Sequence, residues 1–278
     1  MADRPVKKQK IRRWRLLVQT GAFLLIIAAP LLNYYFRIDF IQGFYQSLSI
    51  GDLWFVSPLE GLESILTSKR LHLPLLIGMA VPVLLALFLG RVFCGWICPI
   101  HFLSYLSDKL VKGIGLKKTD KDHLILPHRL IWFALLLELL LTLILGAPIF
   151  VIFSPPALVG REMMRAVFFH VLALEGLVVV IVLLANLVTR RLFCRYFCPL
   201  GGFLAFLGIR RRLKISHPDP ESCNNCGRCA QACPLGLNPA RNEGSSPYCW
   251  NCGECVESCR SGSLHLGWAA KRPELNSQ

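Results

Sequence analysis

Eight cysteines near the end of the chain fall into two runs that share one spacing. The first run is Cys223, Cys226, Cys229 and Cys233, followed by Pro234, and the second is Cys249, Cys252, Cys255 and Cys259. The C-x2-C-x2-C-x3-C spacing is typical of bacterial ferredoxins, in which three neighbouring thiolates hold three iron corners of a cubane. A distant fourth cysteine closes each site. We therefore predict two 4Fe-4S clusters in a small ferredoxin-like α+β domain over residues 216–267.

The fourth cysteine of each run is expected to bind the cluster of the other run. The two ligand sets are then Cys223, Cys226, Cys229 and Cys259 for cluster 1, and Cys249, Cys252, Cys255 and Cys233 for cluster 2. Zinc is the main alternative, since thiolate pairs bind it tetrahedrally. A run of three evenly spaced cysteines leaves one ligand over for zinc, however. Arg260 stands where the second run should carry proline, which affects the local turn and solvent access more than ligation.

The chain is too apolar for an ordinary soluble protein of its length. Of its 278 residues, 54% are hydrophobic and 17% are charged, which predicts a mainly helical membrane protein. All 12 cysteines lie in four short motifs, so cysteine acts here as a ligand or redox residue. The net charge of +14 does not indicate nucleic-acid binding, because the basic residues gather at the ends of apolar segments.

Four apolar segments are long enough to be transmembrane helices. They cover residues 16–36, 71–90, 130–153 and 166–188, and a membrane-spanning helix needs about 20 apolar residues. Residues 1–15 are basic, and the apolar run after them has no convincing cleavage site, which favours a retained signal anchor over a cleaved signal peptide. We assign residues 16–215 to the membrane domain and residues 268–278 to a polar tail.

Basic residues alternate in density between these segments. The N-terminal segment, the 91–129 loop and the residues after 188 are rich in lysine and arginine, whereas the other two loops are poor in them. The positive-inside rule then places both termini and the ferredoxin-like domain in the cytoplasm. Cluster thiols need a reducing compartment, which agrees with this topology.

A second motif, C-x3-C-P, occurs at the ends of the second and fourth apolar segments. Its cysteines are Cys94 and Cys98 in one copy, and Cys194 and Cys198 in the other. The repeat predicts a membrane domain of two parallel halves with two helices each. In a helix, cysteines four apart share one face, and the proline after them ends the helix. Three interpretations stay open for the four thiols: a metal or cluster site, a redox dithiol pair, or a structural cap.

The combination of motifs resembles the membrane-bound ferredoxin-type quinol dehydrogenase subunits of periplasmic nitrate reductase systems, the NapH family. The resemblance covers nearly the whole chain, up to Cys259. It implies a subunit of the bacterial inner membrane that oxidises ubiquinol or menaquinol. It further implies that electrons pass, with an iron-sulfur partner subunit and a membrane cytochrome, toward periplasmic nitrate reductase. The alternative is an accessory membrane polyferredoxin that supplies reducing equivalents or metal for the maturation of another respiratory metalloenzyme.

Two acidic residues lie inside apolar segments, Glu138 in the third and Glu175 in the fourth. Counting at about 1.5 Å per residue places both near the middle of the bilayer. An ionisable group there is costly and indicates a function. Quinol oxidation releases protons, so we expect either carboxylate to accept one. The alternative is a neutral acid that is hydrogen-bonded to a neighbouring helix.

Overall fold

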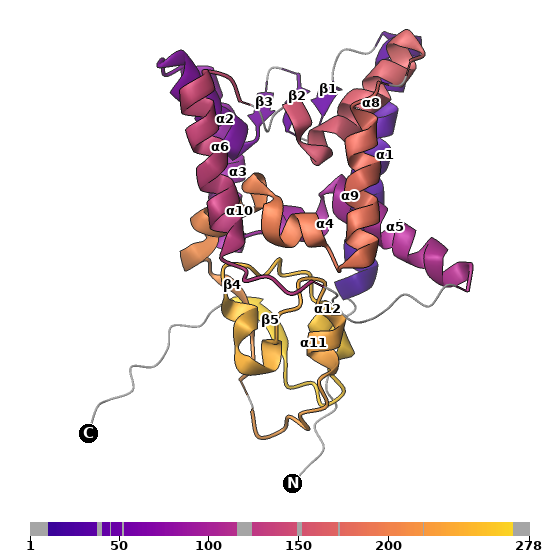
Figure 1. Cartoon of the computed structure of the whole chain (residues 1–278), viewed down its shortest axis with the longest axis vertical. Coiled ribbons are helices and arrows are strands. Elements are labelled where there is room, and N and C mark those ends of the chain that lie inside the picture. Colours follow the sequence, from indigo (N-terminus) through magenta and orange to yellow (C-terminus); the bar gives the residue numbers. More distant parts are fainter. Residues whose placement is uncertain are drawn as a thin grey trace.

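The computed structural model describes residues 11–37, 41–44, 46–51, 53–115, 124–148, 152–171, 173–218 and 220–268. These residues are mainly helical and include two small antiparallel sheets. Figure 1 shows upright helices above a smaller lobe, with the start of α1 on the side of that lobe. Much of the expected basic N-terminus, the middle of the 91–129 loop and the expected polar tail lie outside the described residues.

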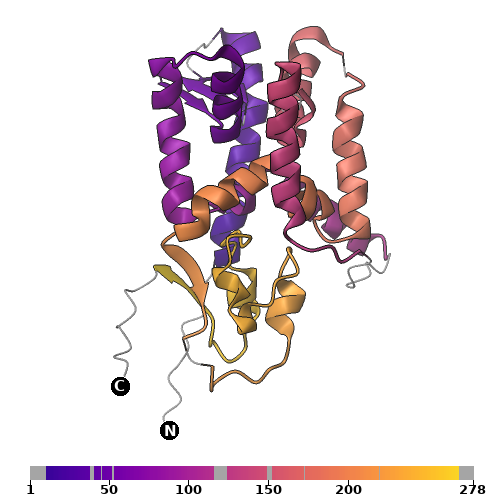
Figure 2. The ribbon, with the colours of Figure 1, turned by 60° about the vertical axis from the view of Figure 1, so that its left-hand side comes forward.

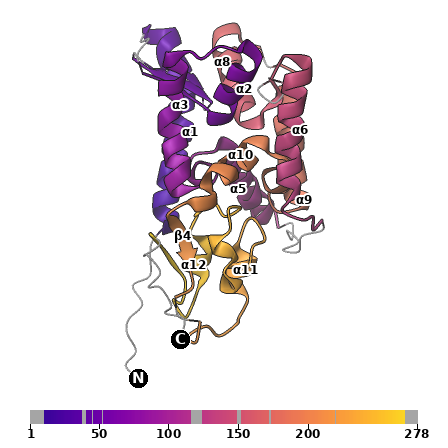
Figure 3. The same cartoon turned by 90° about the vertical axis from the view of Figure 1, so that its left-hand side faces the viewer.

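Four apolar helices stand upright in the molecule: α1 (Ile11–Phe36), α3 (Leu73–Leu89), α6 (Leu130–Leu145) and α9 (Gly176–Val188). Figures 1 and 3 together place them at four corners, with α3 next to α6 in one view and next to α1 in the other. Their outward faces carry many exposed leucine, isoleucine and valine side chains. Soluble proteins rarely expose so continuous an apolar surface.

The lengths of these helices differ from the expectation of four full membrane spans. Among the described helices, only α1, with 26 residues, is long and apolar enough to cross a membrane by itself. The pair of α3 and the following 92–113 segment passes the same test together, with a bend of 90° between its two parts. At about 1.5 Å per residue, the 13 residues of α9 reach about 20 Å.

The expectation of one continuous helix over residues 166–188 is wrong. Helix α8 (Pro155–Phe169) ends at His170, whose φ of 54° is left-handed, and α9 begins only after Glu175. The intervening turn is held by the Glu162 carboxylate, which accepts a hydrogen bond from the Ala173 backbone N–H at 2.9 Å. Glu175 therefore lies at the start of α9, not in the middle of a span.

The two C-x3-C-P motifs have similar local structures, but proline acts differently from the expectation. In the first copy, α4 (Val92–Trp96) ends before Cys98, and Pro99 begins α5 (Pro99–Gly113). In the second copy, the π-helical turn η1 (Phe193–Phe197) is followed by α10 (Pro199–Leu207). Proline suits the first position of a helix because its missing N–H is not needed there. Each proline thus starts a helix that leads away from the cysteines.

A three-stranded sheet and a short helix cover the end of the bundle far from the cysteine-rich lobe (Figure 2). The strands β1 (Ile41–Phe44), β2 (Ser47–Ile50) and β3 (Leu53–Val56) pair in antiparallel order. Helix α2 (Pro58–Ser68) follows and packs against α3 and α6. Gly78 of α3 lets that helix pass close to β3, because an added Cβ would collide with the carbonyl oxygen of Trp54.

The cysteine-rich lobe begins after the 3-10 turn η2 (Gly208–Arg210). Its strands β4 (Leu213–Ser216) and β5 (His265–Trp268) pair antiparallel and join the two ends of the lobe. Between them lie the one-turn helices α11 (Arg228–Ala232) and α12 (Glu254–Ser258) and the turns η3 (Pro239–Arg241) and η4 (Glu243–Ser245). The lobe is therefore a small α+β unit, closed by its own first and last strands.

Candidate iron-sulfur sites

The first four-cysteine cavity lies at the far end of the lobe. It has a volume of about 310 Å³, and its cysteines are Cys223, Cys226, Cys229 and Cys259. Cys226 is exposed, and Cys223 and Cys259 are partly so. Partial burial raises the pKa of Cys259, but hydrogen bonds from Ser261 and Ser263 outweigh it and lower that pKa to about 7. Iron-sulfur clusters bind cysteine as the thiolate. The lowered pKa of Cys259 therefore favours the form in which this fourth cysteine would bind a cluster.

The second four-cysteine cavity lies between the first and the helical bundle. Its cysteines are Cys233, Cys249, Cys252 and Cys255, all of them buried. Both cavities therefore combine three cysteines of one run with the last cysteine of the other. This crossing arrangement is the one that the ferredoxin spacing predicts. Among the described residues, no group of three or more His, Cys, Asp or Glu side chains is arranged around a single metal ion.

The four cysteines of the C-x3-C-P motifs meet in a third cavity. Cys94, Cys98, Cys194 and Cys198 are 7 to 8% exposed and line one space between α4 and η1. Burial raises the pKa of Cys194 to about 12, and it raises the pKa of Cys98 well above the ordinary value. We call this group the four-thiol site. Its thiols are neutral unless a bound cation takes the place of their protons.

Trp250 separates the four-thiol site from the second cavity, and it lines both. Its side chain is 1% exposed. Gly95 lets the first C-x3-C-P motif approach this residue, since an added Cβ would lie 3.2 Å from Trp250 Cβ and 3.4 Å from Cys252 Cβ. His101 of α5 packs edge-on against the Trp250 ring, with 5.0 Å between ring centroids.

Three buried arginines join the helices to the cysteine loops. Arg91 donates to the carbonyl oxygens of Tyr248 and Cys194, both at 3.2 Å. Arg15 donates to the carbonyl of Cys252 at 3.2 Å and pairs with Glu254. Arg211 donates to the carbonyl of Gly244 at 3.1 Å. Each is 1% exposed, so three cations lie where an anionic cluster would need them.

The sequence interpretation missed these arginines and Trp250. Arg91 and Arg191 stand at equivalent places in the C-x3-C-P repeat, and this repeated arginine was the available signal. Trp250 follows Cys249 directly, but nothing in its local sequence indicates that it faces a second set of cysteines. That contact depends on how the lobe docks onto the helices.

The two predicted acids lie in different surroundings. Glu138 is 6% exposed in the middle of α6. Glu175 is partly exposed and forms ion pairs with Arg161 at 3.0 Å and Arg165 at 3.4 Å. The structure does not bring the two predicted acids together. It places Glu138 instead beside α2, where Glu63 is fully buried.

Two acids of α2 were not singled out from the sequence. Burial raises the pKa of Glu63 to about 8, and the nearby Glu138 and Glu60 contribute in the same direction. Burial raises the pKa of Glu60 to about 7, against the opposing effect of Arg161. Neither carboxylate oxygen of Glu63 has a hydrogen-bond partner among the described residues. A buried acid cluster therefore lies at the bundle end opposite the lobe.

Comparison with known proteins agrees with the geometry. A family model described as a 4Fe-4S binding domain matches residues 71–117 and 169–216, the two segments that carry the C-x3-C-P motifs. Another model with the same description matches residues 217–236, within the lobe. No solved structure matches the chain. The class that the cavities and these models define is a ferredoxin-type iron-sulfur protein with two four-cysteine cluster sites in its lobe.

Similar proteins place the chain within this class. It is 30% identical over 226 residues to the ferredoxin-type protein NapH of Haemophilus influenzae, covering 80% of this chain and 74% of that protein. It is 31% identical over 192 residues to the methylamine utilization ferredoxin-type protein MauN of Methylobacillus flagellatus, covering 68% of this chain and 64% of that protein. YccM of Escherichia coli is 29% identical over 188 residues, 64% of this chain and 52% of its own length. The chain belongs to the NapH/MauN family of ferredoxin-type electron-transfer proteins.

Proposed function

We propose that this chain is a membrane-bound subunit that oxidises quinol and passes the electrons, with an iron-sulfur partner subunit, toward a periplasmic nitrate reductase. The family explains the ferredoxin-type sites. The quinol and nitrate reductase roles rest on the resemblance to NapH-type subunits and on the arrangement of the cysteine sites. MauN relatives match about as well as NapH relatives. The choice of nitrate reductase as the terminal enzyme therefore rests on the resemblance in motifs and not on the degree of identity.

The observation that carries the proposal is the row of three cysteine sites. The four-thiol site lies at the bundle, Trp250 separates it from the second cavity, and the first cavity lies at the tip of the lobe. Exposure rises along this row, from buried thiols at the bundle to the exposed Cys226. When bound, the clusters accept and release single electrons. The buried end suits a donor within the bundle, and the exposed end suits a protein partner.

The four-thiol site is best interpreted as the place of a third iron-sulfur cluster. A redox dithiol needs a thiolate of low pKa to react, whereas burial raises the pKa of Cys194 to about 12. The hydrogen bonds of Arg91 to backbone carbonyls suit a structural cap, but a cap does not account for the cation itself, whose Nε has no partner among the described residues. An anionic cluster held by four thiolates accounts for both features.

Membrane placement follows from the apolar helices and the lobe. In a bilayer, α1, α3, α6 and α9 would form two repeated halves. Where α3 and α9 are too short to cross the membrane alone, the bent 92–113 segment and α8 would complete the span. The lobe lies beside the start of α1 (Figure 1), which suits a bacterial inner-membrane protein whose basic N-terminus and lobe are on the cytoplasmic side. The buried acids of α2 and α6 would then handle protons near the opposite face, with Glu138 beside Glu63. Glu175, which is paired with two arginines, has a more structural role.

Anaerobically purified protein with its clusters oxidised is the material for the test. Addition of a short-chain ubiquinol or menaquinol analogue should bleach the visible cluster absorbance within seconds. Electron paramagnetic resonance should show the reduced clusters. Clusters that stay oxidised with both quinols, yet are reduced by dithionite, would contradict quinol oxidation. They would instead favour the accessory role in the maturation of another metalloenzyme.

A further inference from the structure

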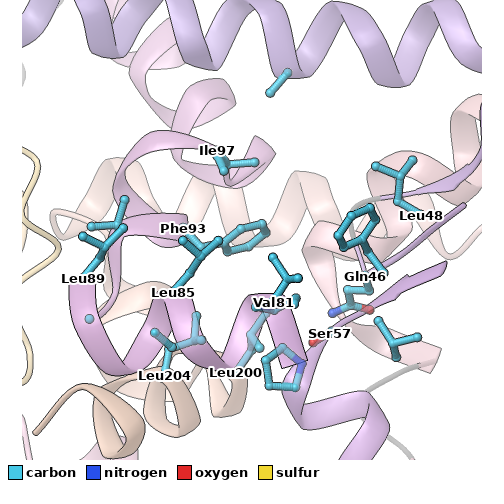
Figure 4. A pocket seen from close by; sticks show the side chains of 18 of the residues that line it. Gln46, Leu48, Ser57, Val81, Leu85, Leu89, Phe93, Ile97, Leu200 and Leu204 are labelled. Atoms are coloured by element: carbon cyan, nitrogen blue, oxygen red, sulfur yellow. The ribbon is translucent and has the colours of Figure 1, made fainter. Parts of the chain in front are cut away.

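A large cavity lies within the helical bundle and not at a cysteine cluster. It has a volume of about 400 Å³ and lies between α1, α3, α4 and the β2–β3 sheet. Its wall is almost wholly apolar, with side chains such as Ile26, Val81, Leu85, Leu89 and Phe93. Figure 4 shows Val81, Leu85 and Phe93 around a common space. A cavity of this volume and lining suits a hydrophobic small molecule.

Two polar atoms lie at one end of the apolar wall, in side chains that Figure 4 labels, and neither has a hydrogen-bond partner among the described residues. They are Gln46 Oε1 and Ser57 Oγ, both fully enclosed. The Gln46 side chain is 3% exposed, and its Nε2 donates to Ser154 Oγ at 2.7 Å. That bond uses Nε2 and leaves Oε1 as an acceptor without a partner among the described residues, in a side chain that lines the cavity. Buried polar groups without partners are rare in proteins and need an explanation.

The other end of the cavity adjoins the four-thiol site. Phe93 and Leu200 line both spaces. Phe93 directly precedes Cys94, and Leu200 follows Pro199 of the second C-x3-C-P motif. The cavity and the four-thiol site thus share part of their walls.

We propose that this cavity binds the quinol, with a ring hydroxyl donating to Gln46 Oε1, Ser57 Oγ beside it, and the isoprenoid tail along α1 and α3. A quinol satisfies the chemistry of both parts of the cavity, because it joins hydroxyl donors to a long apolar chain. A lipid acyl chain would fill the apolar part and leave both polar atoms unpaired. The role of this site in electron transfer rests on the proposed function. Quinol binding to the cavity does not, and it is measured apart from electron transfer.

The geometry also predicts a preference between redox states. A quinol hydroxyl can donate a hydrogen bond to Gln46 Oε1, whereas a quinone has only acceptor oxygens. Gln46→Leu removes the acceptor and puts an apolar side chain of similar volume in its place. It should weaken quinol binding about tenfold, the worth of one hydrogen bond in a buried site, and should leave quinone binding nearly unchanged. A purely structural role of Gln46 would change both affinities alike.

The experiment uses the full chain in detergent with its clusters intact. Binding of 2-heptyl-4-hydroxyquinoline N-oxide is followed by quenching of its fluorescence, and decyl-quinol and decyl-quinone are titrated as competitors. Val81→Trp, which fills the cavity from α3, should abolish binding of all three molecules. Leu84→Trp is the matched control, because Leu84 lies on the same helix, is 52% exposed and does not line the cavity.

The outcomes separate this site from the proposed function. Selective loss of quinol affinity in Gln46→Leu, together with loss of binding in Val81→Trp but not in Leu84→Trp, supports the site. Unchanged affinities in Gln46→Leu and Val81→Trp overturn it, as does a photoreactive quinone that labels only peptides outside residues 22–97 and 200–204. If the cavity binds quinol as expected but quinol leaves the clusters oxidised, the site stands and the proposed function fails.

Discussion

At the scale of single residues, the buried charges of this chain are its most informative feature. Arg15, Arg91 and Arg211 lie buried beside cysteine loops, and Glu63 lies buried at the opposite end of the bundle. A buried charge is expensive unless a partner offsets it. The arginines therefore suit anionic clusters, whereas Glu63 avoids the cost by keeping its proton.

The raised pKa of Glu63 makes stability depend on pH. Burial raises this pKa from 4.5 to about 8, so the folded chain binds a proton more tightly than the unfolded chain does. Stability is then greatest below pH 4.5 and falls as the pH rises to about 8. The expected loss is on the order of 3 kcal/mol. Glu63→Gln, which is always neutral, should remove the Glu63 part of this dependence, leave the smaller part that comes from Glu60, and raise the melting temperature at pH 8 relative to wild type.

Thermal unfolding of wild type and variant at several pH values is the measurement. Glu221→Gln serves as the control, because Glu221 is exposed in the lobe and its replacement should leave the pH profile of wild type unchanged. A Glu63→Gln protein that keeps the full pH dependence would show that another group titrates, and would contradict a buried proton on Glu63.

At the scale of elements, the sequence predicted the features that depend on the spacing of cysteines along the chain. The crossing of Cys233 and Cys259 as cluster ligands is predicted from a ferredoxin pattern that is local and repeated. In the structure, Cys233 lines the cavity of the second run and Cys259 lines that of the first, and the ligand sets stay a prediction. The break between α8 and α9 could not be predicted in this way. Residues 166–188 are apolar on both sides of the break, and the turn depends on a hydrogen bond from the Ala173 backbone N–H to the Glu162 carboxylate of α8, which no pattern in the sequence indicates.

The short sheet was missed for a related reason. Each of its strands has four residues, too few to show the alternation by which strands are recognised. The strands β2 and β3 nevertheless supply part of the apolar cavity in the bundle, including Leu48, Phe55 and Val56. The elements hardest to predict from the sequence are thus the ones that enclose the proposed quinol site.

The α4 and η1 turns should act as one unit if their cysteines share a cluster. Cys94→Ser, Cys194→Ser and the double variant should all lose the third cluster and reduce quinol-dependent electron transfer to a similar low level. Iron should fall from about 12 to about 8 atoms per chain, as expected for one 4Fe-4S cluster fewer. Iron analysis and electron paramagnetic resonance of the lobe clusters, which should persist, are the measurements.

Other results would select among the alternatives for these thiols. Losses that multiply in the double variant would mean two independent motifs. Full activity with unchanged iron in all three variants would leave the structural cap as the explanation. Cys226→Ser is a useful comparison, since this exposed lobe cysteine should affect cluster 1 and leave the iron of the four-thiol site in place.

At the scale of the whole molecule, the lobe and the bundle form one assembly. Side chains from the bundle contact backbone carbonyls of the cysteine loops, as Trp96 does with Asn251 at 3.1 Å and Arg190 with Gln231 at 2.7 Å. The sequence indicated two separate domains joined near residue 215. It could not show that the lobe docks on the helix ends, because that docking depends on contacts between residues far apart in the chain.

The proposed topology predicts the results of reporter fusions. A reporter that works only in the periplasm should be active when joined near residue 55 or 160. It should be silent near residue 115 or after residue 215. The reason is the distribution of basic residues, which keeps the arginine-rich and lysine-rich segments inside. Activity after residue 215 would place the lobe outside and would contradict the reducing environment that its thiols need.

The contact between Arg15 and Glu254 joins the start of α1 to the second cysteine run, 239 residues further along the chain. During synthesis the first helix is therefore complete long before its buried arginine has a partner. That arginine must stay in water until nearly the whole chain has left the ribosome, and only then can it be enclosed. Docking of the first helix is thus among the last steps of maturation, and a chain that stops before Glu254 cannot complete it.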